Sequence, residues 1–195
     1  MVVGHRTGFN VFPLSGFYHF GLVVSNFDQA LDELSSNLGL EWAKVTEFEI
    51  ICEQPNGIVT ADMKVVYSTT GPPHYEVIRV APGTVWGQAD LGIHHLGFWT
   101  ENLEDDHKRL TNSGYMWEST YYNPDTNGPF GFTYHTLQNT GLRIELVDIA
   151  RNRLLITGWL VVIFLRLWNL EEWRVEKYCR HCCHRRRASW HGHSS

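Results

Sequence analysis

One pattern occurs twice in this chain, and it constrains the fold more than any other feature of the sequence. Two apolar, β-rich segments, residues 18–24 and 93–100, both contain the motif His-x-Gly. A polar residue and an amphipathic helical pattern follow each copy. Each half then closes on a short apolar segment that carries one glutamate, Glu76 in the first half and Glu145 in the second. The sequence therefore predicts one structural unit used twice.

The composition is that of a folded protein with an acidic body and a basic end. The chain has 195 residues, of which 43% are hydrophobic and 13% aromatic, so it can bury a sizeable core and is not expected to be disordered. Residues 1–150 hold 7 Lys+Arg against 18 Asp+Glu, or −11, whereas residues 151–195 hold 9 against 3, or +6. Phosphate contacts need clustered basic side chains, so the acidic body argues against a nucleic-acid partner.

Cysteine placement and the chain start both favour a cytoplasmic protein. Three of the four cysteines lie beyond residue 178 and only Cys52 lies in the body, so no disulfide framework is expected. Residues 1–16 form a short leader without the basic and apolar regions of a cleavable signal.

The tail, residues 150–195, is atypical and basic. Its apolar run, residues 154–165, is shorter than the roughly 20 residues of a membrane span. A packed helix, a membrane-surface anchor and a stretch without a folded role all remain open, and membrane association is the least favoured of these. The Cys/His cluster near the end is a poor scaffold for zinc.

The first half is predicted to run strand, helix, strand, strand, strand. Strand 17–24 alternates so that Phe17, His19, Gly21 and Val23 share one face, and the other face is expected to pack on a helix that Gly39 ends. Extended segments at 41–51 and 58–68 flank a hairpin turn, and a last strand covers 74–80.

The second half repeats this order. The expected elements are a strand at 93–100, a helix at 102–113, and strands at 116–122, 130–137 and 142–148. The chain is therefore an α+β domain over residues 17–149, made of two tandem βαβββ modules at 17–80 and 93–149. Whether the two halves close within one chain or across a homodimer is left open.

Four side chains of metal-ligand type occupy matching places in the two modules: His19, Glu76, His95 and Glu145. A single histidine in an apolar strand is more often a satisfied core residue than a ligand. Two glutamates in apolar strands are harder to explain, because burying an unpaired carboxylate costs several kcal/mol. Two imidazoles and two carboxylates would suit a divalent ion such as Zn, Ni, Fe, Mn or Co, in octahedral geometry with positions left for substrate oxygens.

These residues and motifs resemble the vicinal oxygen chelate superfamily, which includes glyoxalase, methylmalonyl-CoA epimerase, extradiol dioxygenases and bleomycin-resistance proteins. The resemblance rests on the paired βαβββ units with His19-Phe20-Gly21, Glu76, His95-Leu96-Gly97 and Arg143-Ile144-Glu145-Leu146. It implies a cupped, barrel-like mixed sheet around a divalent metal held by the four side chains, with Glu145 as candidate base. The nearest branch is glyoxalase- and epimerase-like, although the first strand lacks the arginine with which glyoxalase binds glutathione.

The function this implies is that of a metal-dependent isomerase or lyase acting on a small oxygenated metabolite, such as one of specialised metabolism. Glu145 or Glu76 would remove a proton beside a metal-bound carbonyl. Arg143 would either meet an anionic substrate group or pair with a local carboxylate, and Tyr134 and His74 are further candidates near the substrate. The alternatives are a metal-free binding or resistance protein and an extradiol-type ring-cleaving dioxygenase.

Overall fold

The computed structural model describes residues 16–89 and 92–149. Residues 1–15 of the predicted leader and the whole tail, 150–195, lie outside the described residues, and the expectations for them stay predictions. Within the described part, neither helix has the length and apolarity that crossing a bilayer requires.

Each half of the chain folds as βαβββ, which confirms the predicted order of elements. The elements are β1 (Phe17–Val24), α1 (Phe27–Leu38), β2 (Thr46–Gln54), β3 (Gly57–Tyr67), β4 (His74–Arg79), β5 (His95–Thr100), α2 (Leu103–Asn112), β6 (Tyr115–Tyr121), β7 (Phe132–Leu137) and β8 (Leu142–Asp148). The largest boundary error is at β2, which starts five residues later than expected. Trp42 packs against the α1 cluster there and donates its indole N–H to Ser35 at 2.8 Å, so the chain first crosses the helix.

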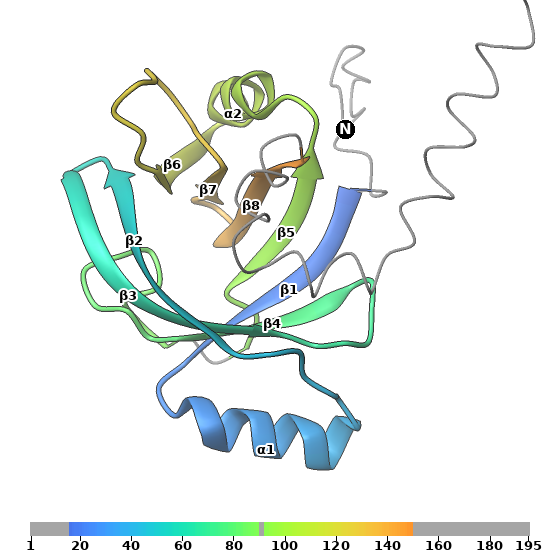
Figure 1. Ribbon diagram of the computed structural model, residues 1–195. Coiled ribbons are helices and arrows are strands. Elements are labelled where there is room, and N and C mark those ends of the chain that lie inside the picture. The colour runs from blue at the N-terminus through green and yellow to red at the C-terminus, as the bar shows by residue number, and fades with distance from the viewer. Residues whose placement is uncertain (1–15, 90–91, 150–195) are drawn as a thin grey trace, which may run out of the picture.

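The eight strands form one closed barrel in the order β1-β4-β3-β2-β6-β7-β8-β5 (Figure 1). Within each module the first and last strands are parallel, β1 with β4 and β5 with β8. The modules join through the antiparallel pair β1 and β5, and through a short contact in which Cys52 and Glu53 of β2 pair with β6. The two halves therefore close within one chain, and the predicted α+β, barrel-like mixed sheet is confirmed.

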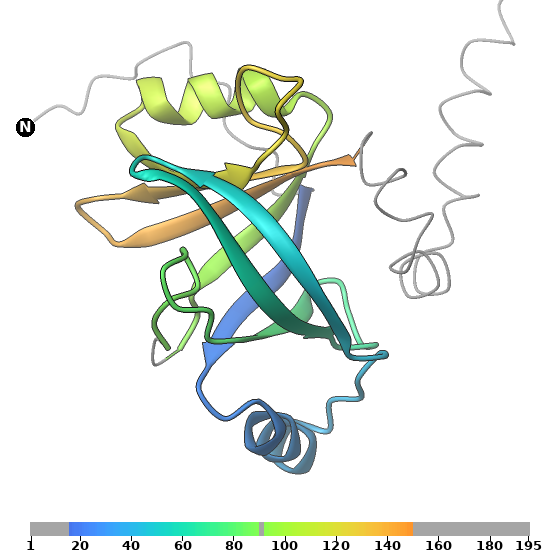
Figure 2. The same ribbon diagram turned by 60° about the vertical axis from the view of Figure 1, so that its left-hand side comes forward.

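The two helices cover opposite sides of the barrel from outside (Figures 1 and 2). Each begins after an asparagine, Asn26 or Asn102, whose side chain accepts a hydrogen bond from a backbone N–H of the first turn. Gly39 ends α1 in the left-handed conformation, with φ +68°. The apolar side of α1 packs with Val66 and Val77, and α2 packs over β5 and β8.

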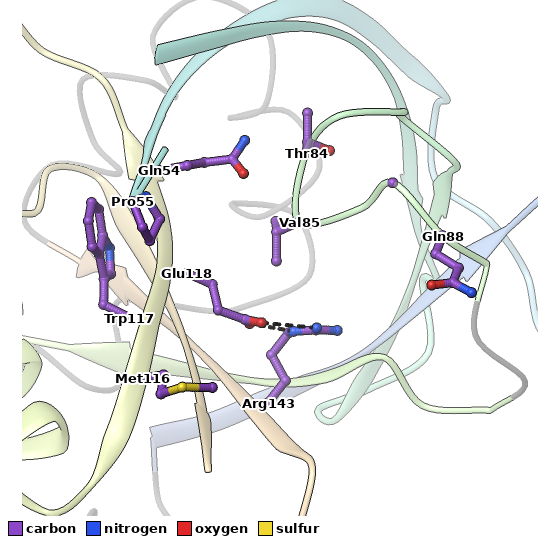
Figure 3. A pocket seen from close by; sticks show the side chains of 10 residues that line it. Gln54, Pro55, Thr84, Val85, Gln88, Met116, Trp117, Glu118 and Arg143 are labelled. Carbon is purple, nitrogen blue, oxygen red and sulfur yellow. Dashed lines mark hydrogen bonds and ion pairs between the residues drawn. The ribbon is translucent and has the colours of Figure 1, made fainter. Parts of the chain in front are cut away.

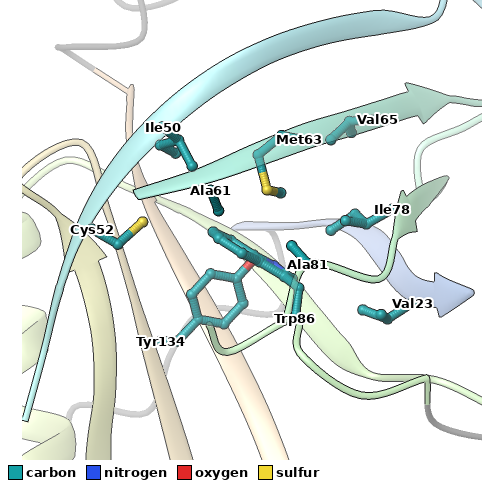
Figure 4. Close-up of a cluster of buried hydrophobic side chains, with 10 residues drawn as sticks. All are labelled: Val23, Ile50, Cys52, Ala61, Met63, Val65, Ile78, Ala81, Trp86 and Tyr134. Carbon is teal, nitrogen blue, oxygen red and sulfur yellow. The ribbon is translucent and has the colours of Figure 1, made fainter. Parts of the chain in front are cut away.

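The inside of the barrel is largely apolar (Figure 4). Its buried cluster comes from strands of both modules and from the linker between them: Val23, Ile50, Cys52, Ala61, Met63, Val65, Ile78, Ala81, Trp86 and Tyr134. Polar side chains inside such a core must find partners there, because water cannot reach them.

The predicted alternation of β1 fails at its first residue. The pairing of β1 with β5 shifts register between Phe17 and His19, as at a β-bulge, and a bulge changes the face to which side chains point. Phe17 therefore packs with the cluster under α2, and its ring lies 4.9 Å from that of Phe20. From Leu22 onward the expected alternation holds, since Leu22 and Val24 pack on the α1 cluster.

Candidate metal centre

The repeated His-x-Gly motif places each histidine over the glycine of the other strand. In the antiparallel pair of β1 and β5, His19 lies opposite Gly97 and His95 opposite Gly21. A Cβ atom on Gly97 would lie 1.9 Å from the His19 ring, and one on Gly21 would lie 1.8 Å from the His95 ring. Neither glycine has a positive φ, so glycine is required here for space and not for backbone conformation.

The two glutamates lie on the strands that pair in parallel with β1 and β5. Glu76 on β4 pairs with Gly21, and Glu145 on β8 pairs with Gly97. The four strands β4, β1, β5 and β8 are consecutive in the barrel, so both carboxylates lie at the level of the imidazoles. The structure thus brings together all four residues that the sequence singled out.

Their ligand atoms share one centre. The Nε2 atoms of His19 and His95 are 2.9 Å apart. Oε2 of Glu76 lies 3.3 Å from Nε2 of His19 and 3.1 Å from Nε2 of His95, and for Oε2 of Glu145 these distances are 3.1 and 3.4 Å. One ligand atom from each residue lies within 4.8 Å of the others, and all four residues are buried.

The donor set fits a divalent cation. The Oε2 atoms of Glu76 and Glu145 are buried, and neither meets hydrogen-bond geometry with any described residue. Leaving buried carboxylate oxygens unsatisfied is costly, and a cation at the point on which they converge would remove that cost. Two imidazole nitrogens and two carboxylate oxygens are the ligands that Zn, Fe, Mn, Co and Ni accept.

Without a metal, a proton on His19 offsets part of the negative charge of the two carboxylates. Burial opposes a charge on His19, but the carboxylates of Glu76 and Glu145 outweigh it and raise the pKa of His19 to about 9. Burial likewise opposes ionisation of Glu76, yet the nearby imidazoles hold the pKa of its carboxyl below the ordinary value. A bound divalent ion would take the place of that proton between the same four groups.

His94, which the sequence analysis did not assign to the site, fixes the orientation of the His95 ring. Burial lowers the pKa of His94 to about 3, with Arg143 and His95 adding to the effect, so its ring is neutral and has one N–H. Its Nε2 lies 3.1 Å from the Val85 carbonyl, which can only accept, so the proton is on Nε2. Nδ1 of His94 then accepts from Nδ1 of His95 at 2.9 Å. Nε2 of His95 is therefore left with its lone pair toward the centre.

A tyrosine contacts each glutamate. Tyr67 on β3 pairs across the sheet with Glu76 and donates to its Oε1, and Tyr134 on β7 pairs with Glu145 and bonds its carboxylate. Trp86 donates to the Tyr134 hydroxyl at 3.2 Å. Burial and the carboxylate charges raise the pKa of both phenols, which keeps them protonated as donors. Tyr134 was expected near the site, whereas Tyr67 was missed, although the repeat places it in the equivalent strand before its glutamate.

The other two predicted substrate residues have protein partners. The buried ring of His74 bonds the Ser68 carbonyl through Nδ1 at 3.0 Å. Arg143 forms a bidentate ion pair with Glu118, at 2.6 Å from Nε to Oε2 and 3.2 Å from Nη2 to Oε1. The pairing with a local carboxylate was one of the two outcomes expected for Arg143, and contact of either residue with substrate stays a prediction.

A cavity of about 630 Å³, which we call the Arg143 cavity, has a lining that does not include the four candidate ligands (Figure 3). Its lining residues come from the β2–β3 hairpin, the linker between the modules, β6 and β8: Gln54, Pro55, Thr84, Val85, Gly87, Gln88, Met116, Trp117, Glu118 and Arg143. Two of its lining residues lie near residues of the cluster, in the chain or through one intermediate side chain. The Val85 carbonyl holds His94, and Arg143 precedes Glu145 by two residues on β8, about 7 Å along one strand face.

Comparison with known proteins agrees with this architecture. The family model described as Glyoxalase/Bleomycin resistance protein/Dioxygenase superfamily matches residues 18–134. The matched range contains His19, Glu76 and His95 and ends before Glu145. No curated protein sequence matches the chain.

Solved structures with a similar fold share little sequence with the chain. A hypothetical protein from Bacillus halodurans C-125 has 14% identity and a TM-score of 0.46, with 68% of this chain and 92% of that chain covered. Methylmalonyl-CoA epimerase from Mycobacterium tuberculosis has 15% identity and a TM-score of 0.45, over 74% and 95%. For a methylmalonyl-CoA epimerase variant from Streptomyces coelicolor the values are 15% and 0.43, over 68% and 95%.

Proposed function

The chain belongs to the glyoxalase/bleomycin resistance protein/dioxygenase superfamily, also called vicinal oxygen chelate, and on that premise we propose that it is a divalent-metal-dependent isomerase or lyase. Its substrate would be a small oxygenated metabolite with a carbonyl beside an acidic C–H bond. One observation carries the proposal: two buried carboxylate oxygens without hydrogen bonds converge on two imidazole nitrogens. A binding protein without a metal would have no use for this arrangement, which is costly to bury.

His19, Glu76, His95 and Glu145 would hold the ion. When bound, the ion supplies a Lewis acid that polarises the substrate carbonyl and stabilises the enolate that forms on proton loss. The protein's share is to hold the ligands in place and to move the proton.

We assign the base to Glu145 in preference to Glu76. Both carboxylates face the centre, but Glu145 shares its strand face with Arg143, which lines the cavity. A substrate in the cavity would therefore present its C–H bond to Glu145. In an isomerase Glu145 takes the proton from one carbon and returns it to the neighbouring carbon or to the opposite face. In a lyase the electron pair left by the proton instead expels a group from the adjacent carbon.

Tyr134 holds Glu145 for this step. Its hydroxyl bonds the carboxylate and is itself held by Trp86, so the base cannot rotate freely when it releases or receives a proton. The apolar cluster around both aromatic side chains keeps water away from the enolate.

Metal analysis tests the proposal first. Protein from metal-supplemented culture is expected to contain about one divalent ion per chain, measured by plasma mass spectrometry, and His95→Ala is expected to lose it. His107→Ala removes a histidine of α2 that lies outside the cluster, and it should keep the ion. Absence of stoichiometric metal in the wild type would end the catalytic proposal.

Proton exchange tests the reaction. The wild type should exchange the carbon-bound proton of α-hydroxyketones or 2-oxo compounds with D₂O, followed by NMR, and Glu145→Gln should abolish exchange. Binding of such compounds without exchange, and with no effect of metal removal, would favour a metal-free binding protein. Oxygen uptake with a catechol would favour a ring-cleaving dioxygenase.

A further inference from the structure

The Arg143 cavity is lined by an ion pair between Arg143 and Glu118. Arg143 and Glu118 bind each other through two hydrogen bonds, and Glu118 also accepts one from the Thr136 hydroxyl at 2.7 Å. Burial opposes ionisation of Glu118, but the bonds from Arg143 and Thr136 outweigh it and lower the pKa of its carboxyl. The carboxylate is therefore charged at neutral pH and cancels the charge of the guanidinium.

A β-bulge aims Glu118 into this position. In the pairing of β6 with β7, Trp117 lies opposite His135 and Ser119 opposite Tyr134, so Glu118 is the extra residue. An extra residue of this kind re-aims a side chain that regular alternation would send elsewhere. The ion pair is thus fixed by three strands of the second module, β6, β7 and β8, and is not a chance contact of mobile surface side chains.

The remaining described residues of the cavity wall are uncharged. Among the described residues that line the cavity, Arg143 and Glu118 are the charged ones. The amides of Gln54 and Gln88 offer donors and acceptors, and Trp117, Met116 and Pro55 offer apolar surface. The wall therefore combines apolar contacts with neutral hydrogen-bonding groups.

We propose that the Arg143 cavity binds the part of the substrate remote from the metal, and that it selects an uncharged group with amide or hydroxyl functions over a carboxylate or phosphate. This inference rests on the proposed function, which places the other end of the substrate at the metal. A second anion beside Arg143 must displace Glu118 or lie next to it, and like charges side by side at a partly buried contact are unfavourable. A neutral acceptor has no such conflict.

A matched pair of probes tests the selection. The α-hydroxyketones 4-(hydroxyacetyl)benzamide and 4-(hydroxyacetyl)benzoate have the same metal-facing end and differ in charge at the other. Their dissociation constants are measured by calorimetry on the full chain, with metal and after chelation. The wild type is expected to bind the benzamide at least about tenfold more tightly, a difference of about 1.4 kcal/mol.

Removal of the Glu118 charge should reverse the preference. Glu118→Gln removes the carboxylate that binds the guanidinium in the cavity, so the benzoate is expected to bind about tenfold more tightly than the benzamide. Glu49→Gln removes the same charge from an exposed position on β2 outside the cavity, and it should leave the ratio unchanged. If Glu118→Gln does not fold, the double variant with Arg143→Gln removes both charges of the described cavity lining, and it should keep the benzamide preference.

The outcomes separate this inference from the proposed function. A wild type that prefers the benzoate, or a ratio that Glu118→Gln does not move, overturns the selection of neutral groups even if proton exchange is intact. A different outcome is a protein that shows no proton exchange and still prefers the benzamide after chelation. That result supports the cavity assignment and contradicts only the proposed metal-dependent reaction.

Discussion

Replacement of Gly97 by alanine should expel His19 from the metal-ligand cluster. The new Cβ would lie 1.9 Å from Cε1 of the His19 ring and 2.5 Å from its Nε2, where ordinary contact begins at 3.4 Å. The ring must therefore move by about 1.5 Å, the difference between 3.4 and 1.9 Å. The backbone of Gly97 has no positive φ, so alanine is not otherwise strained there.

A shift of that size is incompatible with ligation. Bonds from imidazole to zinc are about 2.0–2.1 Å long and tolerate about 0.2 Å. Loss of outer contacts to a ligand costs roughly 10–100-fold in metal affinity, so loss of the ligand itself should cost at least about 100-fold. The crowded ring should also lower the free energy of unfolding of the metal-free protein by about 1–3 kcal/mol.

Two measurements on the same variant check this. Competition with a chelating dye gives metal affinity, and urea unfolding of the metal-free protein gives stability. Gly21→Ala is the symmetric change, with a Cβ 1.8 Å from the His95 ring, and should behave in the same way.

A double-mutant cycle separates the clash of the new Cβ with the His19 ring from other effects of the substitution on stability. In a His19→Ala background the space above Gly97 is open, so Gly97→Ala should then cost about 0.5 kcal/mol or less. The reasoning is refuted if Gly97→Ala keeps metal affinity within about threefold of the wild type, a change of only about 0.7 kcal/mol. Equal destabilisation by Gly97→Ala with and without the His19 ring would refute it as well.

Three further predictions follow from the contacts around the centre. His94→Ala should lower metal affinity by about 10–100-fold, because the hydrogen bond that sets the His95 tautomer is lost. The visible spectrum of a cobalt-loaded sample should change as well, and an unchanged spectrum would contradict the role of His94 in orienting His95. Tyr67→Phe and Tyr134→Phe should each lower the free energy of unfolding by about 0.5–1.5 kcal/mol, measured in urea, through the lost bond to a glutamate; no loss in either variant would count against these bonds. The pKa of His19 rises from 6.5 to about 9 in the folded, metal-free protein. Its contribution to the free energy of unfolding is therefore full below pH 6.5 and disappears as the pH rises through 9. The pKa of Glu76 is lowered from 4.5, so its contribution is lost as the pH falls below 4.5. Burial lowers the pKa of His94 and of His135 from 6.5 to about 3, so the stability of the fold with these rings neutral is lost as the pH falls below 6.5. Stability of chelated protein should therefore peak near pH 6.5, and a rise toward pH 9 would contradict this.

Much of the fold could be predicted from the sequence because the repeat is visible in it. Strand alternation and helix periodicity depend on neighbours in the chain, so β1, α1 and their counterparts β5 and α2 were predicted within two residues. Errors occurred where packing between elements intervenes, as at Trp42 against α1 and at the register shift after Phe17. Neither leaves a signature in the local pattern.

The sequence by itself determined which residues could form the centre, because His19, Glu76, His95 and Glu145 occupy equivalent positions in the two repeated modules. The tertiary structure alone decided how they meet: the antiparallel pairing of β1 with β5 places each imidazole over the glycine of the other strand. It also decided that Glu118, placed by a bulge, neutralises Arg143, and that the Val85 carbonyl fixes the tautomer with which His94 orients His95. Residue type and spacing fix the chemistry that is available, whereas partners across a barrel depend on strand register, which local sequence does not encode.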